Sequence, residues 1–187
     1  MAEEDPRTLA EYASLLLKWN AHLGLVGTNS AAELWASHIA PCAALTAFIP
    51  QNAKLGLDIG SGGGLPGLVL AIHSQIPFHL VESDRRKAAF LREAARVTGA
   101  PVTVHAARIE SLALPRADLV TARALASLPD LLALALPHLT PGGLCLFPKG
   151  QNWDPELRAA EAEFRFSATV HNHPVAGIVV EIRDLRR

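Results

Sequence analysis

A glycine-rich segment between two acidic residues is the part of this sequence whose residue types and spacing could do chemistry. Residues Gly60–Gly67 follow the short apolar run Leu55–Ile59, and Gly62, Gly64 and Gly67 have the G-x-G-x-x-G spacing of dinucleotide-binding loops. Glycine lets the backbone approach a ligand closely and adopt positive φ without strain. The pattern predicts a nucleotide-binding loop that joins a strand to a helix.

Two acidic residues restrict which nucleotides the predicted loop could bind. Asp58 lies at the end of the first predicted strand, where its carboxylate is expected to face the ligand, repel a diphosphate and attract a cation. S-adenosylmethionine carries an ammonium and a sulfonium, so this charge favours it over NAD. Glu82 ends the next predicted strand, where an acid in such folds accepts hydrogen bonds from ribose hydroxyls. The alternative is a tight turn flanked by two solvated acids.

Alternating strands and helices from residue 54 onward must position these groups. Apolar runs of strand length are separated by segments with helical periodicity, which predicts right-handed crossovers and a parallel sheet covered on both faces. The predicted strands are 55–59, 78–81, 102–105, 119–122 and 144–147, the predicted helices are 68–74, 85–97 and 131–139, and a hairpin of 164–170 and 178–182 is expected at the sheet edge.

The residues before the sheet are expected to be helical. Apolar side chains recur every three or four residues across 9–19, and Pro6 suits the start of a helix. A second helical stretch covers Ala31–Phe48, where Pro41 predicts a kink. The sequence therefore predicts a helical extension in front of the α/β sheet.

Composition is that of an ordinary globular protein. The 187 residues are half apolar with a formal net charge of −1, which fits one compact unit, divided here into a helical segment 1–50 and an α/β domain 51–187. The start Met1–Asp5 is acidic, unlike a secretory leader, and the two cysteines Cys42 and Cys145 suit a reducing compartment. Apolar runs fall short of the roughly 20 residues of a membrane span. We expect a cytoplasmic monomer without a membrane partner.

Contact with nucleic acid must come from local charge, because the chain as a whole is not basic. Basic residues are grouped at Arg85–Lys87 with Arg92 and at the C-terminus, and three more, Lys18, Arg123 and Lys149, are expected to converge on the cleft. Trp153 is the aromatic residue nearest Lys149 that could stack on a base. The histidines at 171 and 173 lack further spaced ligands, so no metal site is expected.

Several motifs occur in an order that resembles one known family. The segment Asp58–Gly67 is similar to the cofactor loop of the bacterial small-subunit rRNA guanine-N7 methyltransferases, the glucose-inhibited division protein B family. The resemblance runs from about Tyr12 to the C-terminus. The other matching segments are Lys18-Trp19-Asn20, Leu25-Val26, His38-Ile39, Val81–Asp84, Lys87–Glu93, Arg108–Glu110, Arg123-Ala124 and Lys149-Gly150.

The resemblance implies a class I methyltransferase fold. This is a Rossmann-like, seven-stranded, mostly parallel sheet with helices on both faces and a helical extension in front. It also implies methyl transfer from S-adenosyl-L-methionine, leaving S-adenosyl-L-homocysteine, to N7 of a guanine in 16S rRNA of the small ribosomal subunit. The matched motifs carry the following roles: Gly60, Gly62 and Leu65 at the methionine end of the cofactor, Glu82 at the ribose, Ile109 and Glu110 at the adenine, Arg123 closing the site, and Lys149 near the RNA.

Guanine N7 has a free lone pair and no proton, so its methylation needs orientation rather than a general base. Arg123 is a candidate to hold the base through O6 or a phosphate, or to pair with the cofactor carboxylate. His38 is a candidate substrate contact or a core residue. These three residues, Arg123, His38 and Lys149, are the candidate catalytic residues.

The sequence departs from the family pattern near the expected RNA side. Pro41-Cys42 stands where the family carries Asp-Ser, Ser37 stands where a basic residue usually precedes the histidine, and Gly24 replaces a common Asn. Two alternatives therefore stay open: a methyltransferase acting on another RNA or a small molecule, and a non-catalytic RNA-binding or assembly protein that keeps the cofactor fold.

Overall fold

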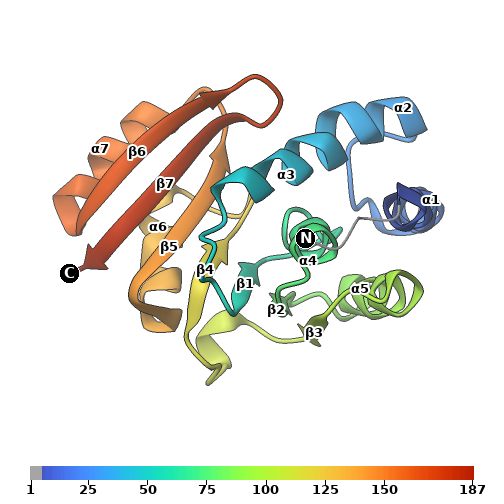
Figure 1. Cartoon of the computed structure of the whole chain (residues 1–187), viewed down its shortest axis with the longest axis horizontal. Helices are drawn as coiled ribbons and strands as arrows, with labels where there is room; N and C mark the ends of the chain where they lie inside the picture. Colours follow the sequence, from blue (N-terminus) through green and yellow to red (C-terminus); the bar gives the residue numbers. More distant parts are fainter. Residues whose placement is uncertain (1–5) are drawn as a thin grey trace.

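The protein, represented by a computed structural model, is described over residues 6–187 and is built on a twisted seven-stranded sheet (Figure 1). The acidic segment Met1–Asp5 at the start of the sequence lies outside the described residues. The strand order is β3-β2-β1-β4-β5-β7-β6, and β7 is antiparallel to both of its neighbours while the first five strands run parallel. The strands are β1 (Gly56–Ile59), β2 (Phe78–Val81), β3 (Val102–His105), β4 (Ala117–Thr121), β5 (Leu139–Lys149), β6 (Arg165–His173) and β7 (Gly177–Arg186).

Helices cover both faces of the sheet and divide the core in two. On one face, α4 (Gly67–Ser74) and α5 (Arg85–Thr98) pack with the N-terminal helices around Leu68 and Phe90. On the other, α6 (Leu128–Ala135) and α7 (Trp153–Glu163) pack around Phe147 (Figure 1). Burial from both sides explains why β1 is continuously apolar apart from Asp58.

The helical extension consists of α1 (Pro6–Leu23) and an irregular rod. The rod comprises α2 (Ala31–Leu34), the π-turn η1 (Trp35–Ile39), α3 (Ala40–Ala44) and the 3₁₀ turn η2 (Leu45–Phe48). In place of a sharp kink at Pro41, the helix widens just before it, and the Ala40 N–H donates to the Trp35 carbonyl. A wider turn suits a proline, which has no N–H to donate and whose ring crowds the preceding turn.

The extension shares a core with the sheet. Buried Leu9, Tyr12 and Leu16 of α1 belong to the same apolar cluster as Leu68 and Phe90. The division between 1–50 and 51–187 stays a prediction. None of the helices within residues 6–187 is both long and apolar enough to cross a membrane.

Most predicted elements are confirmed, and three differ. The helix expected at 131–139 begins earlier and ends in the 3₁₀ turn η4 (Leu136–His138), because Leu139 already starts β5. Strand β5 is longer than the predicted 144–147. Helix α7 was not among the predicted elements; Pro155 fits there because it lies in the first helical turn. The terminal hairpin at the sheet edge is confirmed by β6 and β7.

Gly56 and Gly99 are required for different reasons, the first steric and the second conformational. A Cβ at Gly56 would lie 2.4 Å from the Phe78 ring, whereas Gly99, which ends α5 at φ +64°, has open space around it. We expect Gly99→Ala to lower the free energy of unfolding by about 1–2 kcal/mol through left-handed strain. Gly56→Ala should cost more, by overpacking on top of its small backbone effect. Urea unfolding checks both, and equal losses would contradict the packing assigned to Gly56.

Candidate active site

A cavity of about 430 Å³ opens at the carboxyl ends of β1 and β4, where the strand order reverses direction. Ligands in open parallel sheets bind at this kind of position. The glycine loop forms its floor, Glu82 and Lys87 one side, and the segment after β4 another. The lining residues are Leu25, Val26, Gly27, His38, Gly60, Ser61, Gly62, Gly63, Leu65, Glu82, Ser83, Lys87, Arg123, Ala124 and Leu125.

A smaller chamber of about 120 Å³ adjoins this cavity. It is lined by Ile109 and Glu110, and it shares Gly60, Ser83 and Leu125 with the larger one. The residues expected at the adenine thus lie next to those expected at the methionine end.

Glu82 is placed to hold the loop and to face the cavity. Its Oε2 accepts a hydrogen bond from the Gly62 N–H at 2.9 Å, and its Oε1 accepts one from the Asp84 N–H at 2.8 Å. The side chain is 8% exposed, and the cavity reaches it. Gly62 itself has φ +52°, which favours glycine. The carboxylate therefore orients the loop and presents acceptors where a ribose is expected.

Asp58 differs from the expectation that its carboxylate faces the ligand. The side chain is fully buried, and its Oδ1 accepts a hydrogen bond from the Thr121 hydroxyl at 2.6 Å. Its Oδ2 lies against Gly67 at the start of α4, where a Cβ would come within 2.7 Å of that oxygen. Burial raises the pKa of Asp58 to about 6 in spite of the Thr121 hydrogen bond. Asp58 supports the loop from beneath and does not line the cavity.

Tyr12 also supports the loop. Its hydroxyl donates a hydrogen bond to the Gly63 carbonyl at 2.6 Å, and burial raises the pKa of Tyr12 well above its ordinary value. Sequence reasoning treated Tyr12 only as one apolar position of a helix. A hydroxyl on a buried aromatic residue is the one available signal, because such a group usually finds a partner.

Asn20 shapes the cavity wall that follows α1. Its Nδ2 donates to the Thr28 carbonyl and its Oδ1 accepts from the Val26 N–H, both at 2.8 Å. These bonds fix the 24–28 segment, of which Leu25, Val26 and Gly27 line the cavity. Sequence reasoning had included Asn20 in a matching motif without giving it a role.

Arg123 and His38, both candidate substrate contacts, line the cavity and contact each other. The Arg123 guanidinium donates from Nη2 to His38 Nδ1 at 2.5 Å, and its Nη1 lies 3.7 Å from the Cys42 sulfur. Burial, followed by the Arg123 charge, lowers the pKa of His38, so the ring is neutral near pH 7. Cys42, one of the departures from the family pattern, therefore touches Arg123 directly.

Lys149 does not reach the cavity. Its Nζ forms an ion pair with Glu156 Oε2 at 2.5 Å and donates to the Ala126 carbonyl at 3.2 Å, and the side chain is 9% exposed. Glu156 also accepts from the Leu128 N–H at the start of α6. The pair secures the segment that leads from the cavity to α6, which is a structural role.

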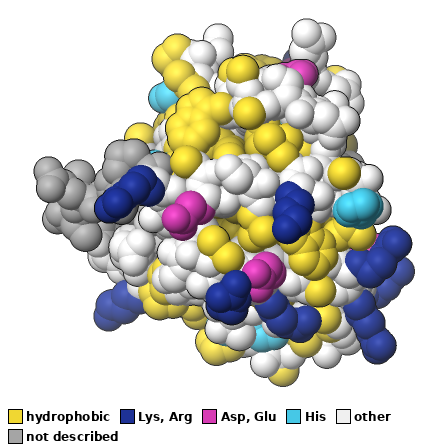
Figure 2. Space-filling view, turned by 90° about the vertical axis from the view of Figure 1, so that its right-hand side faces the viewer, with side chains coloured by type: hydrophobic (Ala, Val, Ile, Leu, Met, Phe, Trp, Pro, Cys, Tyr) yellow, Lys and Arg dark blue, Asp and Glu magenta, His cyan; other side chains and the backbone are white. Residues whose placement is uncertain are grey.

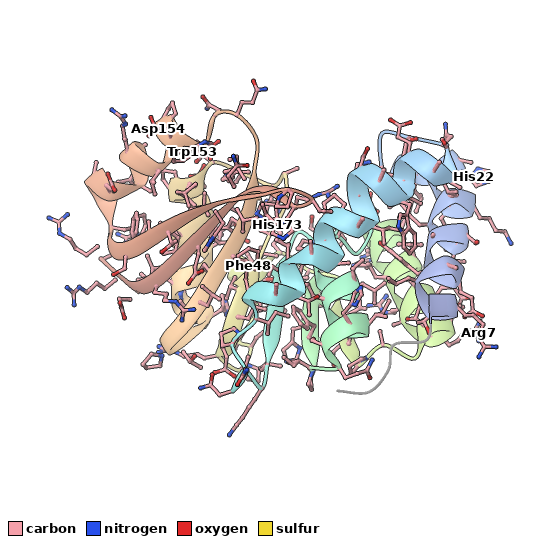
Figure 3. All side chains as sticks on the ribbon, turned by 45° about the horizontal axis from the view of Figure 1, so that its top comes forward. Arg7, His22, Phe48, Trp153, Asp154 and His173 are labelled. Carbon is pink, nitrogen blue, oxygen red and sulfur yellow. The ribbon has the colours of Figure 1, made fainter. Side chains whose placement is uncertain are left out.

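Trp153, His171 and His173 also lie away from the cavity. Trp153, predicted to stack on a base, is half-buried in the core between α6 and α7, at the far end of the sheet from His22 (Figure 3). His171 bonds to Glu181 at 2.8 Å, and His173 packs edge-on against Phe48 (Figure 3). Within residues 6–187 no three His, Cys, Asp or Glu side chains are grouped to hold a metal ion.

The fold and the site define a class I S-adenosylmethionine-dependent methyltransferase. The chain superposes on the Podospora anserina methyltransferase PaMTH1 bound to S-adenosylhomocysteine with a TM-score of 0.67 and 16% identity, covering 96% of this chain and 88% of that one. A Bacillus cereus O-methyltransferase in complex with the same product gives a TM-score of 0.63 and 18% identity, over 98% and 94% of the two chains.

Sequence comparison narrows the class to one family. The profile of the family described as rRNA small subunit methyltransferase G matches residues 5–181. Ribosomal RNA small subunit methyltransferase G of Rhodospirillum centenum is 54% identical over 152 residues, 81% of this chain and 70% of that protein. The Paramagnetospirillum magneticum protein of the same name is 46% identical over 100% of this chain and 92% of that protein. The chain belongs to the rRNA small subunit methyltransferase G family.

Titration of Asp58 should be visible in stability. A pKa raised to about 6 means that the folded state binds a proton that the unfolded state releases near pH 4. Its contribution is full below pH 4 and is lost as the pH rises through 6. We expect the stability of the wild type relative to Asp58→Asn to fall by up to about 3 kcal/mol between pH 4 and 7. Urea unfolding at both pH values checks this, and a constant difference would contradict the burial of an ionisable carboxyl.

Removing one partner of the Lys149–Glu156 pair should destabilise the fold. Lys149→Met leaves a mostly buried carboxylate without its cation, and we expect a loss of about 2–3 kcal/mol in the free energy of unfolding. The double variant Lys149→Met with Glu156→Gln should recover part of that loss, since no charge is then left unpaired. Unchanged stability together with lost methyl transfer would instead make Lys149 a substrate contact.

Proposed function

We propose that this protein transfers a methyl group from S-adenosyl-L-methionine to N7 of a guanine in 16S rRNA. The observation that carries the proposal is a family-specific sequence match over residues 5–181, combined with two adjoining chambers at the switch point of the sheet. Relatives from two organisms, 54% and 46% identical, are named as small-subunit rRNA methyltransferases.

The residues of the two chambers fit the cofactor. The positive-φ glycines leave the floor free of side chains, and a Cβ at Gly62 would meet only the Gly60 carbonyl within 4 Å. Glu82 would accept from the ribose hydroxyls, Ile109 and Glu110 would border the adenine, and Gly60, Gly62 and Leu65 would border the methionine end. When bound, the cofactor supplies an electrophilic methyl group on a sulfonium. The buried Asp58 takes part by holding the loop.

The remaining residues would orient the base. Guanine N7 has an in-plane lone pair and no proton to remove, so alignment of this atom is the main task, and orientation can supply roughly 7–11 kcal/mol in favourable systems. Arg123 would donate to guanine O6, to a phosphate or to the cofactor carboxylate. His38 accepts from the same guanidinium and would act through it. Lys149 would contribute through the fold, given its buried pair.

If the substrate belongs to the small ribosomal subunit, this implies both the partner of the protein and the compartment in which it acts. We propose that the protein acts as a monomer in the cytoplasm on 16S rRNA or on the assembling particle. One observation favours a different substrate: Cys42, which replaces a family serine, touches Arg123 at the cavity. A methyltransferase acting on another RNA is therefore the second candidate.

Mapping of N7-methylguanine in 16S rRNA, from cells with and without the protein, tests the proposal. We expect one guanine to lose its methyl group in the deletion strain and to regain it with the wild-type chain. Gly62→Asp should not restore it and should bind S-adenosylhomocysteine at least 100-fold more weakly, because the new side chain enters the cavity.

Gly99→Asp is the matched control, since Gly99 also has positive φ but lies in open space away from the cavity. It should restore methylation. Methylation of 16S rRNA that does not depend on the protein would rule out the substrate. Rescue by Gly62→Asp would favour the non-catalytic assembly role.

A further inference from the structure

One face of the molecule carries positive charge that the chain as a whole lacks. Helices α1 and α5, which pack against each other, hold seven Lys and Arg and two Glu, a net charge of +5, in a chain whose formal net charge is −1. Figure 2 views the molecule from the side on which both helices lie, and Lys and Arg side chains are spread over this face with few acidic ones among them.

Part of this charge has no partner. Arg86 pairs with Asp84, and Arg96 pairs with Glu93. No ion pair within residues 6–187 engages Lys18, Arg85 or Arg92. Along α5 the exposed positions 85, 86, 89, 92 and 96 recur at helical spacing, so the arginines form one solvent-facing stripe with Ala89 among them.

An apolar groove runs between the two helices. Its volume is about 680 Å³, and its apolar lining includes Leu15, Trp19, Leu23 and Ala89. The polar lining residues are Lys18, His22 and Glu93, and the Glu93 carboxylate pairs with Arg96. The Trp19 ring is half-buried and held in a tilted contact with Phe90, at 5.8 Å between centroids. A second hollow of about 650 Å³ continues the groove and shares Leu15 and Lys18 with it. Hydrophobic atoms are visible between the basic side chains in Figure 2.

The groove and the cavity are lined by adjacent segments of the chain, although they share no lining residue. The 24–27 segment leaves the end of α1 next to Leu23 of the groove and forms a wall of the cavity. A polymer with one unit in the cavity could therefore continue along the groove.

We propose that the groove between α1 and α5 binds the single-stranded RNA next to the target guanine. Phosphates would lie along Lys18, Arg85 and Arg92, and a base would pack on the apolar floor near Trp19. Charge complementarity selects a polyanion, and an apolar floor between cations suits unpaired nucleotides, whose bases are free to leave the backbone, better than a duplex. This inference rests on the proposed function and adds the surface that recognises the substrate.

A charge placed in the groove tests the proposal. Ala89→Glu puts a carboxylate among the cations, and Lys18→Gln removes one cation. Exposed Ala159→Glu and Arg158→Gln on α7, on the opposite face of the sheet, are the matched controls. The probes are 16S rRNA, intact small subunits and S-adenosylhomocysteine, each titrated against the full-length variants.

We expect Ala89→Glu to raise the KM for 16S rRNA at least 10-fold and Lys18→Gln to raise it about 3- to 10-fold. The slope of log K against log salt should fall by about 0.7 for each lost phosphate contact. Binding of S-adenosylhomocysteine and the thermal midpoint should match those of the controls, which separates a lost surface from a lost fold.

Groove variants with wild-type KM and salt slope would overturn the proposal. So would variants that bind naked rRNA normally but lose affinity for intact subunits, because the groove would then dock a ribosomal protein. Failure of the wild-type chain to methylate 16S rRNA at all is a different result, and it would count against the proposed function itself.

Discussion

Two buried side chains fix the glycine loop, and the rest of the site depends on these contacts. The Asp58 carboxyl fills the space between Thr121 and the start of α4. The Tyr12 hydroxyl donates a hydrogen bond to the Gly63 carbonyl. A run of glycines loses more conformational entropy on ordering than any other segment, so contacts from three separate elements are needed to keep one conformation. The cavity wall is thereby formed before any ligand arrives.

The hydrogen-bond partners of Arg123 at the cavity are uncharged. Arg123 is held by a neutral imidazole and a thiol, and within residues 6–187 no carboxylate forms an ion pair with it. Its charge therefore stays available for an anionic group of cofactor or substrate. Lys149 is the contrasting case, because Glu156 neutralises it and draws it into the structure. Arg123 follows β4 and Lys149 is the last residue of β5, and the two basic residues have different roles because their burial and their partners differ.

The fold could be predicted largely because the strands are short, apolar and regularly spaced. Strands β2 and β3 match the predicted ranges, and Asp84 and Gly99 bound α5 as its cap residues. Helix α7 was not predicted, because Trp153, Leu157 and Ala160 are its few apolar core positions and most of its other residues are polar or charged. The positions of the loop and of Glu82 follow from strand order, whereas the contact between Arg123 and His38 was not predicted, since His38 lies outside the sheet. The burial of Asp58 and Lys149 did not, since a side chain's direction depends on partners 63 and 7 residues away.

The contact between Tyr12 and the glycine loop has a consequence for the order of assembly. Tyr12 and Gly63 are 51 residues apart, and the buried side chains of α1 rest on α4 and α5, which come later in the chain. During translation α1 is therefore made before α4 and α5, so its apolar stripe stays exposed until these helices have formed. The hydrogen bond from Tyr12 to the glycine loop can form only when that stripe is buried, so the loop gains this support last.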